Sequence, residues 1–185
     1  TEAYTIRFEN AADASAPAQQ VVITQILDPD LDPRTFRPDD FGWGDFRQEL
    51  TVNRLQYSGR VDLTASRGYY VDVVASVDVP TATITWTLTT IDPATGEMPA
   101  DASIGFLPVN DTVYDENHQV VVEGTHRGEG FVSYTVRPKA GRPSGTRVDA
   151  QASIVFDTQA PIVTPTIFAT LDSGRPSSQV APLPA

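Results

Sequence analysis

Three aspartates spaced two residues apart are the strongest candidates for chemistry in this sequence. The segment reads Asp28-Pro-Asp-Leu-Asp-Pro33. Proline favours extended backbone in its neighbourhood, and residues two apart on an extended chain lie on one face, so the three carboxylates are expected to converge. Calcium takes about six to eight oxygen ligands and would relieve their mutual repulsion. The alternative is an acidic turn exposed to water.

Three further aspartates in the next segment complete the predicted calcium ligands. Residues 34–48 mix acidic and aromatic side chains with no regular period, so they are predicted to form a long loop of the kind that often carries function. The cluster is not an EF-hand, because Pro33 stands where that loop needs glycine. Calcium is the one cofactor that the sequence suggests, with these ligands: Asp28, Asp30, Asp32, Asp39, Asp40 and Asp45.

The same segment carries an aromatic group that could bind a ligand. Trp43 lies between Gly42 and Gly44, with Phe41 and Phe46 close by. Aromatic faces stack on the apolar faces of sugar rings, so Phe41, Trp43 and Phe46 would suit a carbohydrate-binding loop. The alternative is that these rings fold back and cover one end of the fold.

Other catalytic or metal chemistry has little support. The chain has no cysteine, which excludes disulfides, thiolate zinc sites and cysteine nucleophiles. His118 and His126 are the only histidines, and their spacing indicates surface positions rather than a metal site. The sequence contains neither a Gly-Xaa-Ser-Xaa-Gly nucleophile motif nor a glycine-rich phosphate loop. Among 24 acidic residues, a pair with the spacing of catalytic carboxylates can be chosen by chance and carries no information. No enzyme activity is therefore predicted.

The net charge of the chain limits the kinds of partner that it can bind. The formal net charge of −11 would repel nucleic acids and acidic membrane surfaces at long range. No apolar run approaches the roughly 20 residues of a membrane-spanning helix. We therefore expect neither nucleic acid nor membrane insertion.

Alternating apolar and polar residues predict the elements that position these groups. In residues 84–91, Ile84, Trp86 and Leu88 alternate with threonines, which is typical of a strand with one buried face. Similar signals predict strands at 4–8, 21–27, 50–57, 60–65, 70–79, 120–123, 131–137, 146–156 and 164–171. No helical period is evident. The predicted fold is all-β, an Ig-like antiparallel β-sandwich with two long loop insertions at 34–48 and 92–110.

Four segments carry a resemblance to a known family. They are residues 16–31, Ile84-Thr-Trp-Thr-Leu88, Gly130-Phe-Val-Ser-Tyr-Thr-Val136 and Asp149-Ala-Gln-Ala-Ser-Ile-Val-Phe-Asp157. Together they resemble the Ig-like conserved repeat domains of very large secreted or surface-attached bacterial proteins, although Asp149 or Gln151 replaces the asparagine usual in that family. The resemblance implies a β-sandwich in a secreted or cell-surface protein, with neighbouring modules of the same polypeptide as partners.

These observations together predict a module at residues 1–172 and an extended Pro/Ser-rich linker toward a following module at 173–185. Its predicted role is non-catalytic: a structural spacer in a large extracellular bacterial protein, rigidified by calcium. The alternative is a carbohydrate-binding or adhesive module that binds polysaccharide through the aromatic loop around Trp43.

Overall fold

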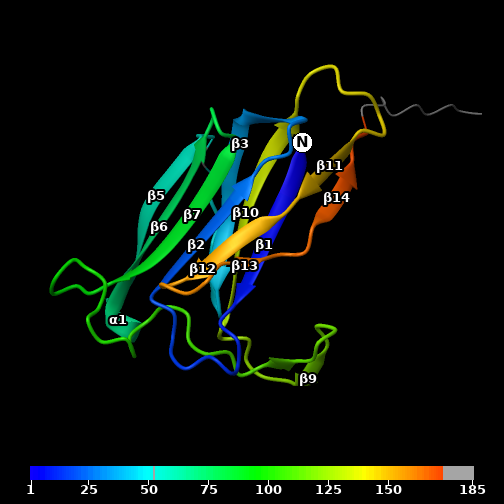
Figure 1. Ribbon diagram of the computed structural model, residues 1–185. Coiled ribbons are helices and arrows are strands. Elements are labelled where there is room, and N and C mark those ends of the chain that lie inside the picture. Colours follow the sequence, from blue (N-terminus) through cyan, green and yellow to red (C-terminus); the bar gives the residue numbers. More distant parts are fainter. Residues whose placement is uncertain (52, 173–185) are drawn as a thin grey trace, which may run out of the picture.

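The computed structural model describes residues 1–51 and 53–172, in which two antiparallel β-sheets pack face to face (Figure 1). One sheet has four strands in the order β1-β10-β3-β4, and the other has six in the order β13-β12-β2-β7-β6-β5. The all-β sandwich predicted from the sequence is confirmed. The four-stranded sheet contains β1 (Glu2–Glu9), β3 (Leu31–Trp43), β4 (Phe46–Gln48) and β10 (Glu129–Pro138). The six-stranded sheet contains β2 (Gln20–Ile26), β5 (Gln56–Leu63), β6 (Tyr69–Asp78), β7 (Thr83–Ile91), β12 (Ala152–Phe156) and β13 (Ile162–Val163).

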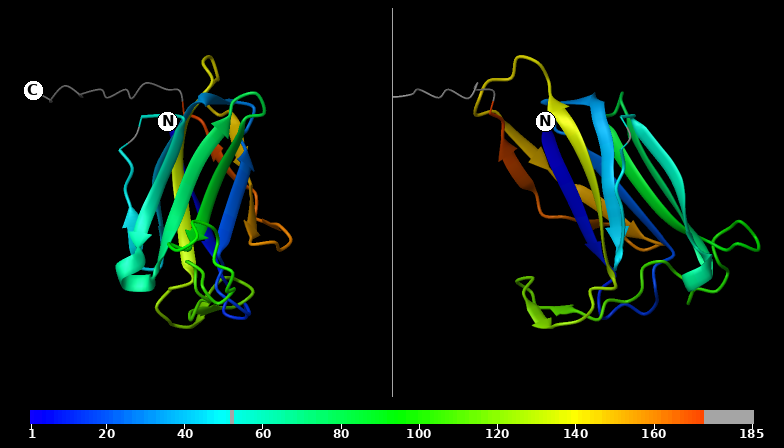
Figure 2. Two further views of the ribbon diagram at one scale, coloured as in Figure 1. Left: turned by 90° about the vertical axis from the view of Figure 1, so that its left-hand side faces the viewer. Right: turned by 180° about the vertical axis from the view of Figure 1, so that it is seen from behind.

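Smaller elements extend the sandwich. They are the hairpin of β8 (Val113–Tyr114) with β9 (Val120–Val122), the pair of β11 (Arg147–Ala150) with β14 (Ile167–Thr170), and the single helical turn α1 (Thr64–Arg67). The β8–β9 hairpin and the loop before it gather at one end, and both ends of the described chain lie at the other (Figure 2). No helix among the described residues is long and apolar enough to cross a membrane.

Strand β7 follows its predicted pattern closely. Ile84, Trp86 and Leu88 are at most 1% exposed, while the threonines between them are half-buried. Strand β7 pairs with β2 on one side and β6 on the other, which places Trp86 in the middle of the six-stranded sheet. Phe41 of β3 reaches Trp86 from the opposite sheet, with 6.1 Å between the ring centroids.

The prediction of a loop at residues 34–48 is wrong, because these residues form most of β3 and all of β4. Phe36 and Phe41 are five residues apart, so a regular strand would turn them to opposite faces, yet both are fully buried. The pairing of β3 with β10 shifts register twice along its length, and such irregularities change which face a residue occupies. These shifts break the period of two, which explains why the sequence showed no strand pattern.

Other boundaries also differ from prediction, and residues 53–55 of the strand expected at 50–57 are not part of a strand. The hairpin expected at Ser58 and Gly59 is a continuous part of β5, and the strand expected at 146–156 divides at Gln151. On either side of Gln151, β11 pairs with β14 and β12 pairs with β2. The loop at 92–110 is confirmed, with only a single bridge between Ala18 and Leu107. The linker predicted at 173–185 lies outside the described residues.

Replacing Trp86 by alanine should strongly destabilise the fold. The ring is fully buried, so Trp86→Ala should lower the free energy of unfolding by about 3 to 5 kcal/mol in urea denaturation. Trp86→Phe should cost less, because the indole N–H has no hydrogen-bond partner among the described residues and its loss leaves no group unpaired. Val74→Ala, at a side chain that is 42% exposed on β6, is the control. Equal losses for Trp86→Ala and Val74→Ala would contradict the central role of Trp86.

Candidate functional site

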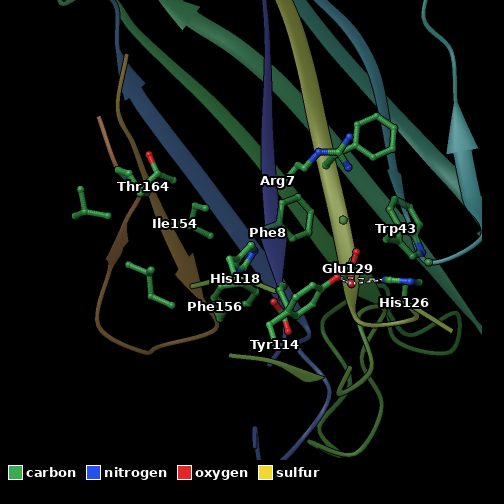
Figure 3. Close-up of a pocket in the computed structure, with 17 residues that line it drawn as sticks. Arg7, Phe8, Trp43, Tyr114, His118, His126, Glu129, Ile154, Phe156 and Thr164 are labelled. Carbon is green, nitrogen blue, oxygen red and sulfur yellow. Dashed lines mark hydrogen bonds and ion pairs between the residues drawn. The ribbon is translucent and has the colours of Figure 1, made fainter. Parts of the chain in front are cut away.

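A groove runs along β1, where the two sheets fail to meet at their edges. Its larger part is a cavity of about 720 Å³ between β1, the β12–β13 region and the β8–β9 hairpin (Figure 3). A smaller cavity of about 250 Å³ continues beside Tyr4 and Ile6. Both cavities are lined by Arg7, Thr164 and Pro165, so together they form one channel, here called the β1 groove. A volume of this size is in the range of ligand sites.

The walls of the β1 groove differ in character. One wall is apolar and includes Ile154, Phe156, Ile162 and Val163. Figure 3 shows Ile154, Phe156 and Thr164 on that side and Tyr114, His118 and Glu129 near the lower end, with Phe8 between them. The groove therefore combines a long apolar surface with a polar end.

Glu129, at the start of β10, is the centre of this polar end. Its Oε1 accepts hydrogen bonds from Tyr114 Oη at 2.6 Å and Asn110 Nδ2 at 3.2 Å, and lies 2.7 Å from His126 Nδ1. Burial alone would raise the pKa of Glu129, but the bonds from Tyr114 and His126 outweigh it and leave the pKa below its usual range. The bond to Glu129 also raises the pKa of Tyr114 to about 12.

His126 is held by carboxylates on both sides. Its Nε2 lies 3.0 Å from Glu123 Oε1, opposite the contact of Nδ1 with Glu129. A neutral imidazole has one N–H, whereas the protonated ring has two, so this arrangement favours the protonated form. The hydrogen bonds to Glu129 and Glu123 accordingly raise the pKa of His126. His118 is exposed as predicted and stacks on Tyr114 with 4.8 Å between centroids.

Asn110 positions this cluster on the sandwich. It is 3% exposed, and its Nδ2 also donates to Glu9 Oε1 on β1 at 3.2 Å. Its backbone N–H donates to the carbonyl of Asn10 at 2.8 Å, which joins the end of the long loop to the end of β1. Gly128 is required beside it, because a Cβ there would lie 2.5 Å from the Asn110 nitrogen. Tyr114, His126 and Glu129 were not predicted as a group, since neither spacing nor residue type indicates that they meet.

Five of the six aspartates predicted to bind calcium have a hydrogen-bond or ion-pair partner within the chain, and Asp39 lies beside Asp40. Asp28 accepts hydrogen bonds from the backbone N–H groups of Asp30 and Asp149, both at 2.8 Å. The other contacts are Asp30 with Arg142 at 3.0 Å, Asp32 with Arg34 at 3.0 Å, Asp40 with Arg47, and Asp45 with Arg67 at 3.7 Å. Burial, and then the neighbouring Asp40, raise the pKa of Asp39.

The six aspartates are not brought together into one shell. Asp32 and Asp45 lie near opposite ends of β3, and thirteen residues of extended chain span roughly 40 Å. Across residues 1–51 and 53–172, no group of three or more His, Cys, Asp or Glu side chains is placed to hold a metal ion. Calcium binding at the first three aspartates remains a hypothesis from the sequence, and thermal unfolding with and without calcium tests it.

The aromatic group is part of the core. Phe41 is fully buried, Trp43 is 6% exposed and Phe46 is half-buried. Trp43 contacts Phe46 at 4.6 Å and the edge of Phe106 at 5.1 Å between centroids, and it also contributes to the lining of the β1 groove. These rings fold inward, which corresponds to the structural alternative given above for this segment.

The comparisons with known proteins found a match to a protein family. Residues 85–170 match a family described as a domain of unknown function (DUF7619). No curated protein and no solved structure matches the chain. The matched range begins in β7 and ends with β14, and it includes the polar end of the β1 groove.

We expect the melting temperature to be the same in millimolar calcium and in excess chelator. Asp30 and Asp32 already have arginine partners, and both oxygens of Asp28 accept backbone N–H groups, so an added cation would displace existing contacts. Thermal unfolding followed by circular dichroism measures this. A higher melting temperature in calcium, abolished by Asp28→Asn, would instead establish a calcium site at this turn.

The contribution of His126 to stability should disappear as the pH rises. Its pKa is higher in the folded than in the unfolded chain, so the contribution is fully present below about pH 6.5, the unfolded pKa, and is lost as the pH passes the raised folded pKa. Glu129 stays ionised and Tyr114 stays neutral across this range. The difference in melting temperature between wild type and His126→Gln should be larger at pH 5.5 than at pH 9, by about a few degrees at most.

The imidazole itself can be followed by NMR titration. Glu123→Gln and Glu129→Gln should each lower the pKa of His126, because each removes one carboxylate partner. Glu97→Gln, at an exposed loop position, is the control. A His126 pKa unchanged in both partner variants would show that the two contacts do not act in solution.

Proposed function

We propose that this chain is a non-catalytic structural module of a large extracellular bacterial protein, where it carries and presents neighbouring modules. The observation that supports this most is the burial of Phe41 and Trp43. These rings pack in the core and are not exposed for binding a sugar. The resemblance to Ig-like conserved repeat domains supports a secreted or cell-surface location, and the sandwich architecture agrees with it.

Residue 1 and the end of the described chain lie at the same end of the sandwich (Figure 2). The β8–β9 hairpin and the polar end of the β1 groove lie at the opposite end, away from both of these points of the chain.

The polar cluster does not favour an enzyme. A general base needs a nitrogen or oxygen free to take a proton from substrate. Both nitrogens of His126 face carboxylates, so neither is free to take a proton from a substrate. These contacts suit a cluster that holds loops together, which supports a non-catalytic role.

A glycan screen on wild type, Trp43→Ala and Trp43→Phe tests this proposal against the carbohydrate-binding alternative. We expect no binding by any of the three proteins. Trp43→Ala should lower the free energy of unfolding by about 3 kcal/mol or more, and Trp43→Phe by less, because the indole fills the core beside Phe46 and Phe106. Binding by the wild type that Trp43→Ala abolishes at unchanged stability would overturn the proposal in favour of carbohydrate binding.

A further inference from the structure

We propose that the β1 groove binds an extended segment of another polypeptide, which adds a strand to the free edge of β1. The segment would alternate apolar and polar residues, with a basic residue opposite Glu9 and an acidic residue opposite Arg7. This inference concerns a surface that the structural role proposed above does not use.

The free edge of β1 lies along the groove. All eight residues of β1 pair with β10 on one side, and nothing in residues 1–51 and 53–172 pairs with its other side. Successive N–H and C=O groups of a strand point alternately to its two sides, so this edge offers a row of unused donors and acceptors. Residues 4–9 line the two cavities, which places that row where an added strand would lie.

The facing wall offers apolar surface that such a strand would cover. Ile162, Val163 and Ile167 are 55%, 57% and 59% exposed, and all three line the groove. Side chains on one face of an inserted strand would contact them, together with Phe8 and Ile154.

The charges on β1 specify the segment. Arg7 and Glu9 are two residues apart and so share a face of β1, and both line the groove. In the described part of the chain, neither makes an ion pair. Opposite charges facing each other across strands stabilise pairing, and like charges weaken it. An antiparallel segment that reads basic, apolar, acidic from its N-terminus matches Glu9, Phe8 and Arg7 in turn.

A second copy of this chain fits the same edge less well. Two β1 strands paired with Arg7 opposite Glu9 would overlap only at residues 7, 8 and 9, because β1 ends at Glu9. Each copy also carries a net charge of −11, so the two would repel at long range. A separate extended segment avoids both costs.

Two synthetic peptides of equal composition test the proposal. Both have the eight-residue length of β1. The matched peptide is Lys-Val-Glu-Val-Thr-Val-Thr-Val, and in the swapped peptide the lysine and glutamate exchange places. We expect the wild type to bind the matched peptide about tenfold more tightly in fluorescence anisotropy, since two charge pairs change sign between them. Hydrogen exchange at the free-edge amides of β1 should slow only when peptide is bound.

Variants of the chain distinguish binding of the peptide in the β1 groove from non-specific binding. The double variant Arg7→Glu with Glu9→Arg keeps the net charge and should reverse the preference toward the swapped peptide. Ile162→Asp should weaken binding of the matched peptide at least about tenfold. Val74→Asp, which places the same charge at another exposed apolar position away from the groove, should not weaken it. All four positions are half-buried or exposed, so the fold should tolerate the changes.

Several results would overturn the proposal. They are absence of binding at millimolar peptide, equal affinity for both peptides, or equal effects of Ile162→Asp and Val74→Asp. Dimerisation in sedimentation experiments that Ile162→Asp abolishes would assign the groove to a second copy. Slow hydrogen exchange at the free-edge amides of β1 in the free monomer would show that a segment of the chain itself covers the β1 groove.

Discussion

The contact between Phe41 and Trp86 joins the two sheets, and much of the structure depends on it. Phe41 comes from β3 in the four-stranded sheet and Trp86 from β7 in the six-stranded sheet, and both are fully buried. Phe41 also lies within 6.3 Å, centroid to centroid, of Trp43, Phe46 and Tyr57. Large rings supply much of the apolar area buried in a core, and here four other rings gather around Phe41. That concentration explains why a segment rich in aromatic residues forms no exposed binding loop.

Among the described residues, the outer edge of β1 stays open because the strand that follows β10 turns away from it. Residues 147–150 form β11, which pairs with β14, and the chain enters the six-stranded sheet only after Gln151. The carboxylate of Asp28 accepts the backbone N–H of Asp149 at 2.8 Å, which ties β11 to the turn between β2 and β3. With β11 held there, no strand of residues 1–51 and 53–172 pairs with the outer edge of β1, and the β1 groove lies along that edge. The outer edge of β1 is therefore open for pairing.

Local patterns predicted those elements whose burial follows a simple period. Strand β7 was predicted almost to the residue because Ile84, Trp86 and Leu88 alternate without interruption. Strand β3 was missed because its two register shifts against β10 bring Phe36 and Phe41 to the same face at an odd spacing. No local signal marks a shift that depends on the partner strand. The polar end of the groove was missed for a related reason: Asn110, Tyr114, His126 and Glu129 meet through loop geometry, including a positive φ of 59° at His126.

Many of the acidic residues have one of two roles. At six turns among the described residues, the side chain of an aspartate accepts the backbone N–H of the residue two positions later, as in Asp28 with Asp30 and Asp32 with Arg34. Aspartate is favoured at such turns because its short side chain reaches that N–H. The spacing that suggested metal ligands is therefore also the spacing of turn formation.

Glutamates instead occupy the polar end of the groove. Glu9 and Glu129 face each other across β1 and β10, and both accept from Asn110 Nδ2, although like charges in register weaken a strand pair. The cost is offset at Glu129 by His126 and Tyr114, whereas Glu9 makes no ion pair with any described residue. A sandwich that needed acidic residues only for turns would have no reason to place an unneutralised carboxylate there. Its position beside an open strand edge is accounted for if a basic side chain binds opposite it.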